Sequence, residues 1–403
     1  MQRLVRPLQR FVKAETSGGI LLIGCTAVAL IWANSPWAGS YFHLWHADPT
    51  FGLAGKLLSQ PLHFWINDGL MALFFLLVGL EIKRETLVGE LASFRKAALP
   101  IAAALGGMIV PAGLYVLFNQ GGPGASGWGI PMATDIAFAL GVLALLGKRV
   151  PASLKVFLAA LAIADDIGAV LVIAFFYTEQ ISWISLGVGG LFFVALIAAN
   201  RAGARHPLIY AILGLGLWLA FVPSGIHPTV AGVLLAITIP TRQCVDSSAF
   251  SARGESTMLR FEDALLPWNR YFIMPVFALA NAGVIWGAGA AHSLADPISL
   301  GVICGLVLGK PVGIVLFSWV ATRSRVAAML DGISWRHILG VGMLGGIGFT
   351  MSLFIANLAF GKTPALETAK MGILVASLVS ALGGAVFLAS GGRQREARSL
   401  PAS

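Results

Sequence analysis

Charged residues are scarce in this sequence. Only 11% of its 403 residues are Asp, Glu, Lys or Arg, whereas 57% are hydrophobic. Because soluble domains carry about 25% charged residues, this composition excludes a water-soluble fold. Nucleic-acid binding is also disfavoured, since the lysines and arginines stand in short clusters between apolar runs rather than along one basic face.

Cysteine is scarce as well. The three cysteines, Cys25, Cys244 and Cys304, lie far apart and lack the spacing of a zinc site or a disulfide framework. No cluster of His and Cys in the sequence suits a transition metal. We therefore expect neither redox chemistry nor a bound cofactor.

Long apolar runs dominate instead. A transmembrane helix needs about 20 apolar residues, and this rule predicts an all-α polytopic membrane protein with twelve transmembrane segments. The predicted segments are 14–33, 61–87, 97–118, 124–146, 152–177, 183–200, 207–220, 225–238, 257–285, 299–321, 335–359 and 366–390. The seventh and eighth are short for a full crossing and could be tilted, broken or parts of one hairpin.

The N-terminal segment shares some features with a cleaved signal peptide. Basic residues precede its apolar run, and Leu22 to Cys25 resembles a lipoprotein cleavage site. However, Glu15 interrupts the leader, the run continues through Trp32, and many further segments follow. We therefore expect residues 14–33 to form the first transmembrane helix.

Basic residues are distributed unevenly between alternate loops. Most of the 27 lie in the N-terminus, residues 83–96, 148–155, 201–205, 241–260 and 323–336, and the C-terminus. Lys56, Lys362 and Lys370 fall on the other side, and Arg270 and Lys310 lie inside apolar segments. Because cytoplasmic loops carry the excess of Lys and Arg, this bias predicts an inner-membrane protein with both termini in the cytoplasm.

Two predicted segments are interrupted near their middles by residues that break helices. Segment 124–146 is interrupted at residues 129–135, and segment 335–359 at residues 345–350. The two segments are seven apart in order, and an odd offset reverses orientation. Interrupted helices at corresponding places in two opposed halves indicate a transporter site near the membrane midplane. The alternative is that the glycines only allow close helix packing.

Asp165 and Asp166 are adjacent carboxylates near the middle of segment 152–177. A charge inside the membrane costs several kcal/mol, so such residues are functional candidates, although a paired structural charge is the alternative. Neighbouring residues point about 100° apart on a helix, so one carboxylate can line an aqueous path while the other meets a neighbouring helix. Lys310, in another apolar segment, is the candidate partner, unless it is only a structural counter-charge.

Asp135 is the third intramembrane acid and, with Thr134, lies in an interrupted segment. Breaking a helix frees amide and carbonyl groups, and each end carries about half a unit charge. An aspartate beside opposed N-terminal ends and a lysine beside opposed C-terminal ends would neutralise them. Asp135 therefore either balances helix ends or binds an ion directly, and Thr134 supplies a hydroxyl donor or ligand.

The oxygen atoms of these side chains suit small hard cations. The same carboxylates also bind protons, and removal from water favours their neutral form. A cation and protons can therefore compete for one site. This competition suffices for exchange, because an empty and fully charged site is costly to move.

Four motifs around these residues resemble the NhaA-type sodium/proton antiporter family over nearly the whole chain. They are Ala133-Thr134-Asp135-Ile136-Ala137-Phe138, Ala164-Asp165-Asp166-Ile167-Gly168-Ala169, Gly309-Lys310-Pro311 and Gly346-Ile347-Gly348-Phe349-Thr350-Met351-Ser352. The resemblance implies inverted repeats of segments 3–5 and 10–12, an architecture for which this family is itself a standard example. It also implies core segments at about 97–177 and 299–390, and interface or dimer segments at about 14–87 and 183–285.

The resemblance also implies roles for the site residues. Asp165 and Asp166 would bind the ion and protons, with Asp166 the stronger candidate for sodium ligation. Lys310 would pair with Asp165 and be released or deprotonated during the cycle, while Thr134 and Asp135 would belong to the crossing of broken helices. The family is not enzymatic: it extrudes sodium or lithium electrogenically in exchange for inward protons, is activated at alkaline pH, and forms dimers through the loop that here spans about 34–60.

The family's pH-responsive region corresponds here to six residues. They are Glu81, Lys83, Arg84, Glu85, His227 and Glu262. The alternatives are an interfacial histidine without a sensing role and, for residues 81–85, a solvated ion-pair cluster. Asn67 and Asp68 fit either a polar lining or a local cap. Residues 241–256 do not match the family pattern, so we assign no sensor residue there.

Three other functions compete with antiport. A sodium-coupled symporter of organic solutes could share the broken helices but would need a solute cavity. An intramembrane aspartyl protease needs its two aspartates on separate helices, whereas Asp165 and Asp166 are consecutive. In a passive cation channel, Lys310 would oppose cation flow.

Overall fold

Helices form the described structure. The computed structural model describes residues 2–47, 60–178, 181–241, 256–287, 289–330 and 332–398, and these residues contain helices and connecting turns but no strand. The predicted all-helical fold class is therefore confirmed. Cys244 and the central parts of the loops at 34–60 and 241–256 lie outside the described residues.

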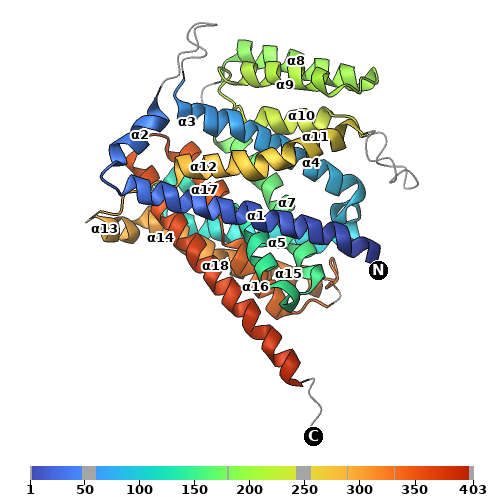
Figure 1. Cartoon of the computed structure of the whole chain (residues 1–403), viewed down its shortest axis with the longest axis vertical. Coiled ribbons are helices and arrows are strands. Elements are labelled where there is room, and N and C mark those ends of the chain that lie inside the picture. Colours follow the sequence, from blue (N-terminus) through green and yellow to red (C-terminus); the bar gives the residue numbers. More distant parts are fainter. Residues whose placement is uncertain are drawn as a thin grey trace. The chain divides into compact units, whose positions relative to one another are not determined.

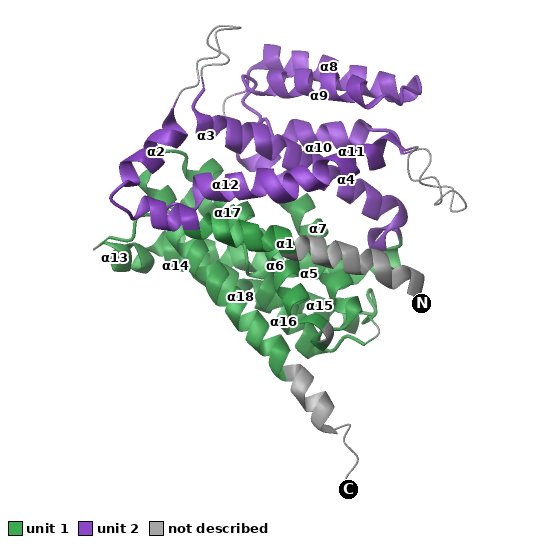
Figure 2. Cartoon of the chain, viewed as in Figure 1, with its two compact units in different colours: residues 1–27, 93–169, 284–403 green, residues 28–92, 170–283 purple. Residues whose placement is uncertain are grey.

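The chain divides into two compact units (Figure 2). Unit 1 consists of residues 1–27, 93–169 and 284–403, and unit 2 consists of residues 28–92 and 170–283. The helices α1 (Gln2–Ala33) and α7 (Ala152–Phe176) contribute to both units. The roles implied by the family resemblance, a transport core and a dimer interface, stay predictions.

Unit 1 contains two trios of the same kind, in which a long helix, an interrupted helix and another long helix follow one another. The first trio is α5 (Phe94–Asn119), then η4 (Ala125–Met132) with α6 (Ile136–Leu145), then α7. The second is α14 (Pro297–Cys304), η7 (Gly305–Gly309) and α15 (Lys310–Arg323), then α16 (Trp335–Gly345) with α17 (Phe349–Phe360), then α18 (Pro364–Arg398). The short helices η5 (Gly147–Arg149) and α13 (Ala290–Ala295) lie between these elements in the chain.

Unit 2 is built around α4 and the helices that pack on it. Its elements are α2 (Ala38–His46), α3 (Leu62–Phe64), η2 (Trp65–Leu70), α4 (Met71–Val88), η3 (Glu90–Ala92), α8 (Trp183–Arg201), α9 (Pro207–Phe221), α10 (Val230–Thr238), α11 (Thr257–Trp268), η6 (Asn269–Ile273) and α12 (Met274–Asn281). The helices α8 and α9 lie side by side, and α10 packs against α4 (Figure 1). Leucine, tyrosine and tryptophan side chains from α4, α8, α9 and α10 form the buried core of this unit.

Every one of the twelve predicted segments coincides with a helix or a run of consecutive helices. Among the described residues, seven helices are long and apolar enough to cross a membrane, and two bent pairs pass the same test together. One bent pair is α16 and α17, where the helix axis bends by 47° at the break. The segments predicted to be short are short: α9 has 15 residues and α10 has 9. Twelve crossings are compatible with this arrangement.

Glycines allow α5 and α15 to approach closely. A methyl group added at Gly106 would meet the main-chain oxygen of Gly313 and the side chain of Phe317. A methyl group added at Gly313 would in turn meet the carbonyl group of Gly106. Small residues at helix crossings are a common basis of packing between membrane helices. This contact holds α15, which begins with Lys310, against α5.

Replacing Gly106 by Ala should therefore destabilise the protein by about 1 to 3 kcal/mol, because the added methyl group overpacks the crossing. Thermal unfolding of the purified protein measures this as a lower midpoint. Gly113→Ala is the matched control on the same helix, since nothing lies within 4 Å of a methyl group added there. Equal midpoints for the two variants would contradict the close approach.

Candidate functional site

The two interrupted helices of unit 1 cross at their breaks. Residues 133–135 separate η4 from α6, and residues 346–348 separate α16 from α17. The amide of Asp135 donates to the carbonyl of Ile347 at 2.7 Å, and the hydroxyl of Thr134 donates to the carbonyl of Gly345 at 3.0 Å. Each break therefore supplies hydrogen-bond partners to the other.

Asp135 caps the N-terminal ends of two helices at once. Its Oδ1 accepts from the amide of Phe138 at 3.1 Å, at the start of α6. Its Oδ2 accepts from the amide of Thr350 at 3.1 Å and from the hydroxyl of Thr350 at 2.5 Å, at the start of α17. The residue is 1% exposed. A carboxylate suits this position, because both helix ends carry partial positive charge.

Lys310 joins a carboxylate to a C-terminal helix end. Its Nζ donates to Oδ2 of Asp165 at 2.7 Å and also to the carbonyl of Met132, the last residue of η4. Lys310 is 0% exposed. The ammonium group therefore has an anionic partner and a carbonyl partner, as a charge excluded from water requires.

Asp165 and Asp166 are both buried on α7, at 1% and 4% exposure. Oδ1 of Asp165 has no hydrogen-bond partner among the described residues, and the hydroxyl and amide of Thr134 lie near the same carboxylate. Asp166 is close enough to Lys310 to attract it electrostatically. The pair thus adds two carboxylates to a site with one ammonium group.

The carboxylates of the site do not form a conventional metal centre. In the part of the chain that the structure describes, no three His, Cys, Asp or Glu side chains converge as the ligands of a resident metal would. The oxygen atoms at Asp165 and Asp166 are suited instead to hydrogen bonds, protons or a hard monovalent cation. Such a site can gain and lose its occupant.

The residues predicted to respond to pH fall into separate groups within unit 2. Arg84 contacts both Glu262 and Glu85, the latter at 3.5 Å. Lys83 donates to the carbonyls of Ile237 and Ile239 at 2.7 and 2.5 Å, at the end of α10. Glu81 lies on α4 with them.

His227 belongs to a different contact from the Arg84 group. Its Nε2 lies 3.0 Å from Oδ1 of Asp68, and its Nδ1 lies 2.7 Å from the hydroxyl of Thr229. Asp68 therefore has a specific partner. Asn67 accepts from the side-chain amide of Asn281 of α12 at 2.9 Å and donates to the side-chain oxygen of Asn281 at 3.4 Å. Sequence reasoning left both residues unassigned between a polar lining and a local cap.

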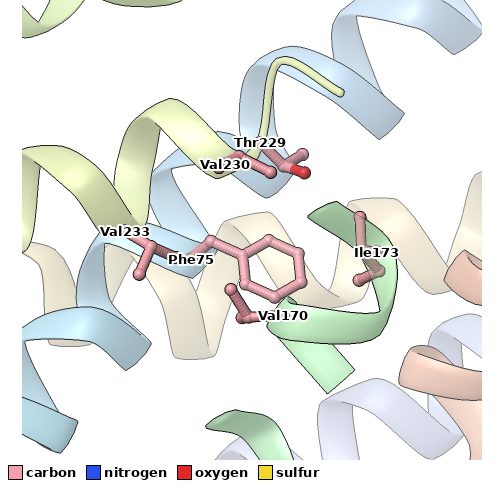
Figure 3. A pocket seen from close by; sticks show the side chains of 6 residues that line it. All are labelled: Phe75, Val170, Ile173, Thr229, Val230 and Val233. Atoms are coloured by element: carbon pink, nitrogen blue, oxygen red, sulfur yellow. The ribbon is translucent and has the colours of Figure 1, made fainter. Parts of the chain in front are cut away.

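A small apolar pocket, too narrow to hold a water molecule, also lies in unit 2 (Figure 3). Its lining consists of Phe75, Val170, Ile173, Thr229, Val230 and Val233. Thr229 is the only polar residue among them, and no carboxylate lines the pocket. This pocket therefore presents no charged side chain to a ligand.

Sequence reasoning missed part of the polar network around the breaks. The hydroxyl of Ser352 donates to the carbonyl of Ile130 at 2.8 Å, and the hydroxyl of Ser377 accepts from the amide of Phe349 at 3.1 Å. Thr350 and Ser352 lie in a motif that the sequence did single out. Ser377 had no such signal, because a lone serine in an apolar segment is typical of helix packing.

The chain matches known proteins over nearly its whole length. Residues 9–388 match the sequence model of the family described as Na+/H+ antiporter 1. A protein of Koribacter versatilis named "Na(+)/H(+) antiporter NhaA" is 49% identical, over 96% of this chain and 91% of its own length. A protein of the same name from Oleidesulfovibrio alaskensis is 47% identical, over 96% of this chain and 94% of its own length.

A solved structure supports the fold alone. The sodium proton antiporter MjNhaP1 from Methanocaldococcus jannaschii superposes with a TM-score of 0.53, covering 97% of this chain and 98% of that one. The two sequences are only 14% identical.

The buried pair of Asp165 and Lys310 predicts a specific pattern in a double-mutant cycle. Asp165→Asn or Lys310→Met alone should each cost about 3 to 5 kcal/mol, because one buried charge loses its partner. The double variant should lose less than the sum of the two, because no unpaired charge remains. Thermal unfolding of the four proteins measures the coupling. Strictly additive losses would show that the two side chains do not act as a pair.

Proposed function

Because this chain belongs to the Na+/H+ antiporter 1 family, we propose that it exchanges sodium ions for protons across a bacterial inner membrane. The observation that carries the proposal is the buried contact of Lys310 with Asp165, 2.7 Å long, next to Asp166. It combines an ammonium group, two carboxylates and two helix breaks in one place. Helix packing alone does not require buried charges beside two helix breaks.

The exchange rests on competition at the two carboxylates. Asp166 ligates the sodium ion directly, together with an oxygen of Asp165 once Lys310 has left it. Lys310 then releases its proton or turns to the carbonyl of Met132, its second partner. When protons return, Asp165 pairs with Lys310 again and the ion leaves. Lithium follows the same route, because the oxygen ligands suit any small hard cation.

More than one proton-binding group supports electrogenic exchange. A sodium ion carries one positive charge, whereas Asp166 and the pair of Asp165 with Lys310 can each take up a proton. The exchange moves net charge whenever both protons enter for one departing sodium ion. The burial of all three side chains, at 4% exposure or less, supports tight coupling, because ions cannot reach them from bulk water without a change in conformation.

We also propose activation at alkaline pH through the ion pair of Arg84 with Glu262 and its neighbours Glu81, Lys83 and Glu85. Glu262 is buried, at 2% exposure, and its contact with Arg84 links α11 to α4. His227, paired with Asp68, is a separate group in this response.

Assembly and orientation complete the proposal. The protein forms a homodimer through the region of residues 34–60, and both of its termini are cytoplasmic. Within that region, Trp37, which precedes α2, and Leu44, near the end of α2, are exposed apolar side chains.

The first test of the proposed function uses everted membrane vesicles that hold a proton gradient. Adding sodium or lithium should dissipate the gradient, and Asp166→Asn should abolish this response because the ligating carboxylate is gone. Glu367→Gln is the matched control, since Glu367 is a carboxylate whose side chain is 48% exposed and which pairs with Lys370 outside the site. A response that persists in Asp166→Asn, or that needs no sodium or lithium, would refute the assignment.

The second test addresses the pH response. Glu262→Gln removes the charge that pairs with Arg84, so the pH at which activity is half-maximal should shift from that of the wild-type protein. Asp263→Asn, on the exposed neighbouring position of α11, should leave the pH profile unchanged. The measurement is the initial rate of sodium-dependent proton release in vesicles between pH 6.5 and 9, about half a unit apart. Superimposable profiles for wild type and Glu262→Gln would remove Glu262 from the pH response.

A further inference from the structure

Two buried serines on α18 face the break between α16 and α17. Ser377 and Ser380 are one helical turn apart and are 7% and 3% exposed. Neither has a place in the exchange described above. Buried hydroxyl groups inside a membrane protein need partners, so their surroundings show what they do.

Ser377 completes the N-terminal cap of α17. The N-cap residue is Gly348, which has no side chain to cap the helix. The next amide, that of Phe349, donates to Oγ of Ser377 at 3.1 Å, and the following amide, that of Thr350, donates to Asp135. The start of α17 is therefore held by two side chains from two other helices.

The bond to Ser377 affects the carboxylate of Asp135. That carboxylate already accepts from Phe138 and twice from Thr350. Without Ser377, the amide of Phe349 would be buried without a partner, at a typical cost of about 1 to 3 kcal/mol. The nearest strong acceptor at this helix end is Asp135, so the carboxylate would shift, and Thr134 beside it would move relative to Asp165.

Ser380 lies at the other side of the same break. A methyl group added at Gly346 would overlap the hydroxyl of Ser380 and the carbonyl of Leu306. The hydroxyl of Ser380 has no hydrogen-bond partner among the described residues. The carbonyl of Leu306 receives no donor from the usual place in its helix, because the amide of Lys310 bonds to Gly305 and Pro311 has no N–H group.

We propose that Ser377 and Ser380 are positioning residues for cation exchange, which hold the two ends of the α16 and α17 break on α18. Ser377 fixes the start of α17 and with it the carboxylate of Asp135. Ser380 supplies a donor for the carbonyl of Leu306, one turn before Lys310, when the break changes shape during the cycle. This inference rests on the proposed function for its transport readout only.

The experiment compares Ser377→Ala, Ser377→Thr, Ser380→Ala and the control Ser390→Ala, a serine at an exposed position of the same helix. In vesicles, Ser377→Ala should raise the sodium concentration for half-maximal exchange about tenfold, while Ser377→Thr, which keeps the hydroxyl, recovers most of the affinity. Ser380→Ala should lower the maximal rate with little change in that concentration. Ser390→Ala should match the wild type.

A second readout does not depend on transport. Hydrogen exchange measured by mass spectrometry on a peptide covering residues 346–352 should be faster in Ser377→Ala than in the wild type, and normal in Ser377→Thr. If Ser377→Ala does not fold, Ser377→Cys carries the same test, because its sulfur fills the same space but is a weak acceptor.

The outcomes separate the two proposals. Wild-type affinity and wild-type hydrogen exchange in Ser377→Ala would overturn the positioning role of Ser377. A maximal rate of Ser380→Ala equal to that of Ser390→Ala would overturn the role of Ser380. If the wild-type protein moves no sodium, the proposed function fails, and the hydrogen-exchange contrast still decides whether Ser377 holds the start of α17.

Discussion

Main-chain groups released where a membrane helix breaks must find partners inside the protein, because lipid offers none. This constraint organises unit 1. Asp135 caps the N-terminal ends of α6 and α17. Lys310 donates to the carbonyl of Met132, and Thr134 donates to the carbonyl of Gly345. Asp135 and Lys310 thus stabilise backbone ends in addition to the ion-binding role proposed above, which explains how such costly residues persist in a buried position.

Lys310 links the two requirements. The same ammonium group contacts Asp165 and the end of η4. A change in its carboxylate partner would therefore also change its hydrogen bond to the backbone of the break. The carboxylate of Asp165 and the end of η4 are therefore linked through one side chain. The close glycine contact of α5 with α15 supports this, because it fixes the helix from which Lys310 projects.

Sequence reasoning found the charged members of the site and Thr134, but it missed Ser377. Asp165, Asp166, Asp135 and Lys310 were visible because an ionised group in an apolar run is rare, and all four lie in one polar network or directly beside it. Ser377 could not be distinguished from a packing residue, because its role depends on which helix end it meets. The separate partners of Arg84 and His227 were likewise not predictable, since ion pairing across helices depends on tertiary contacts that no local pattern records.

The turn that precedes Lys310 has a consequence for how this chain tolerates length changes. In η7 the amide of Lys310 bonds five residues back to Gly305, so the helix holds one residue more than a regular turn would. Removing a single residue from 305–309 would restore a regular turn and leave the residues after it in nearly the same orientation, because five residues of such a wide turn advance the helix by about the same angle as four residues of a regular one. Lys310 would therefore still face Asp165 after such a deletion, whereas a deletion in the regular helix α14 would rotate Lys310 by about 100° relative to what precedes it.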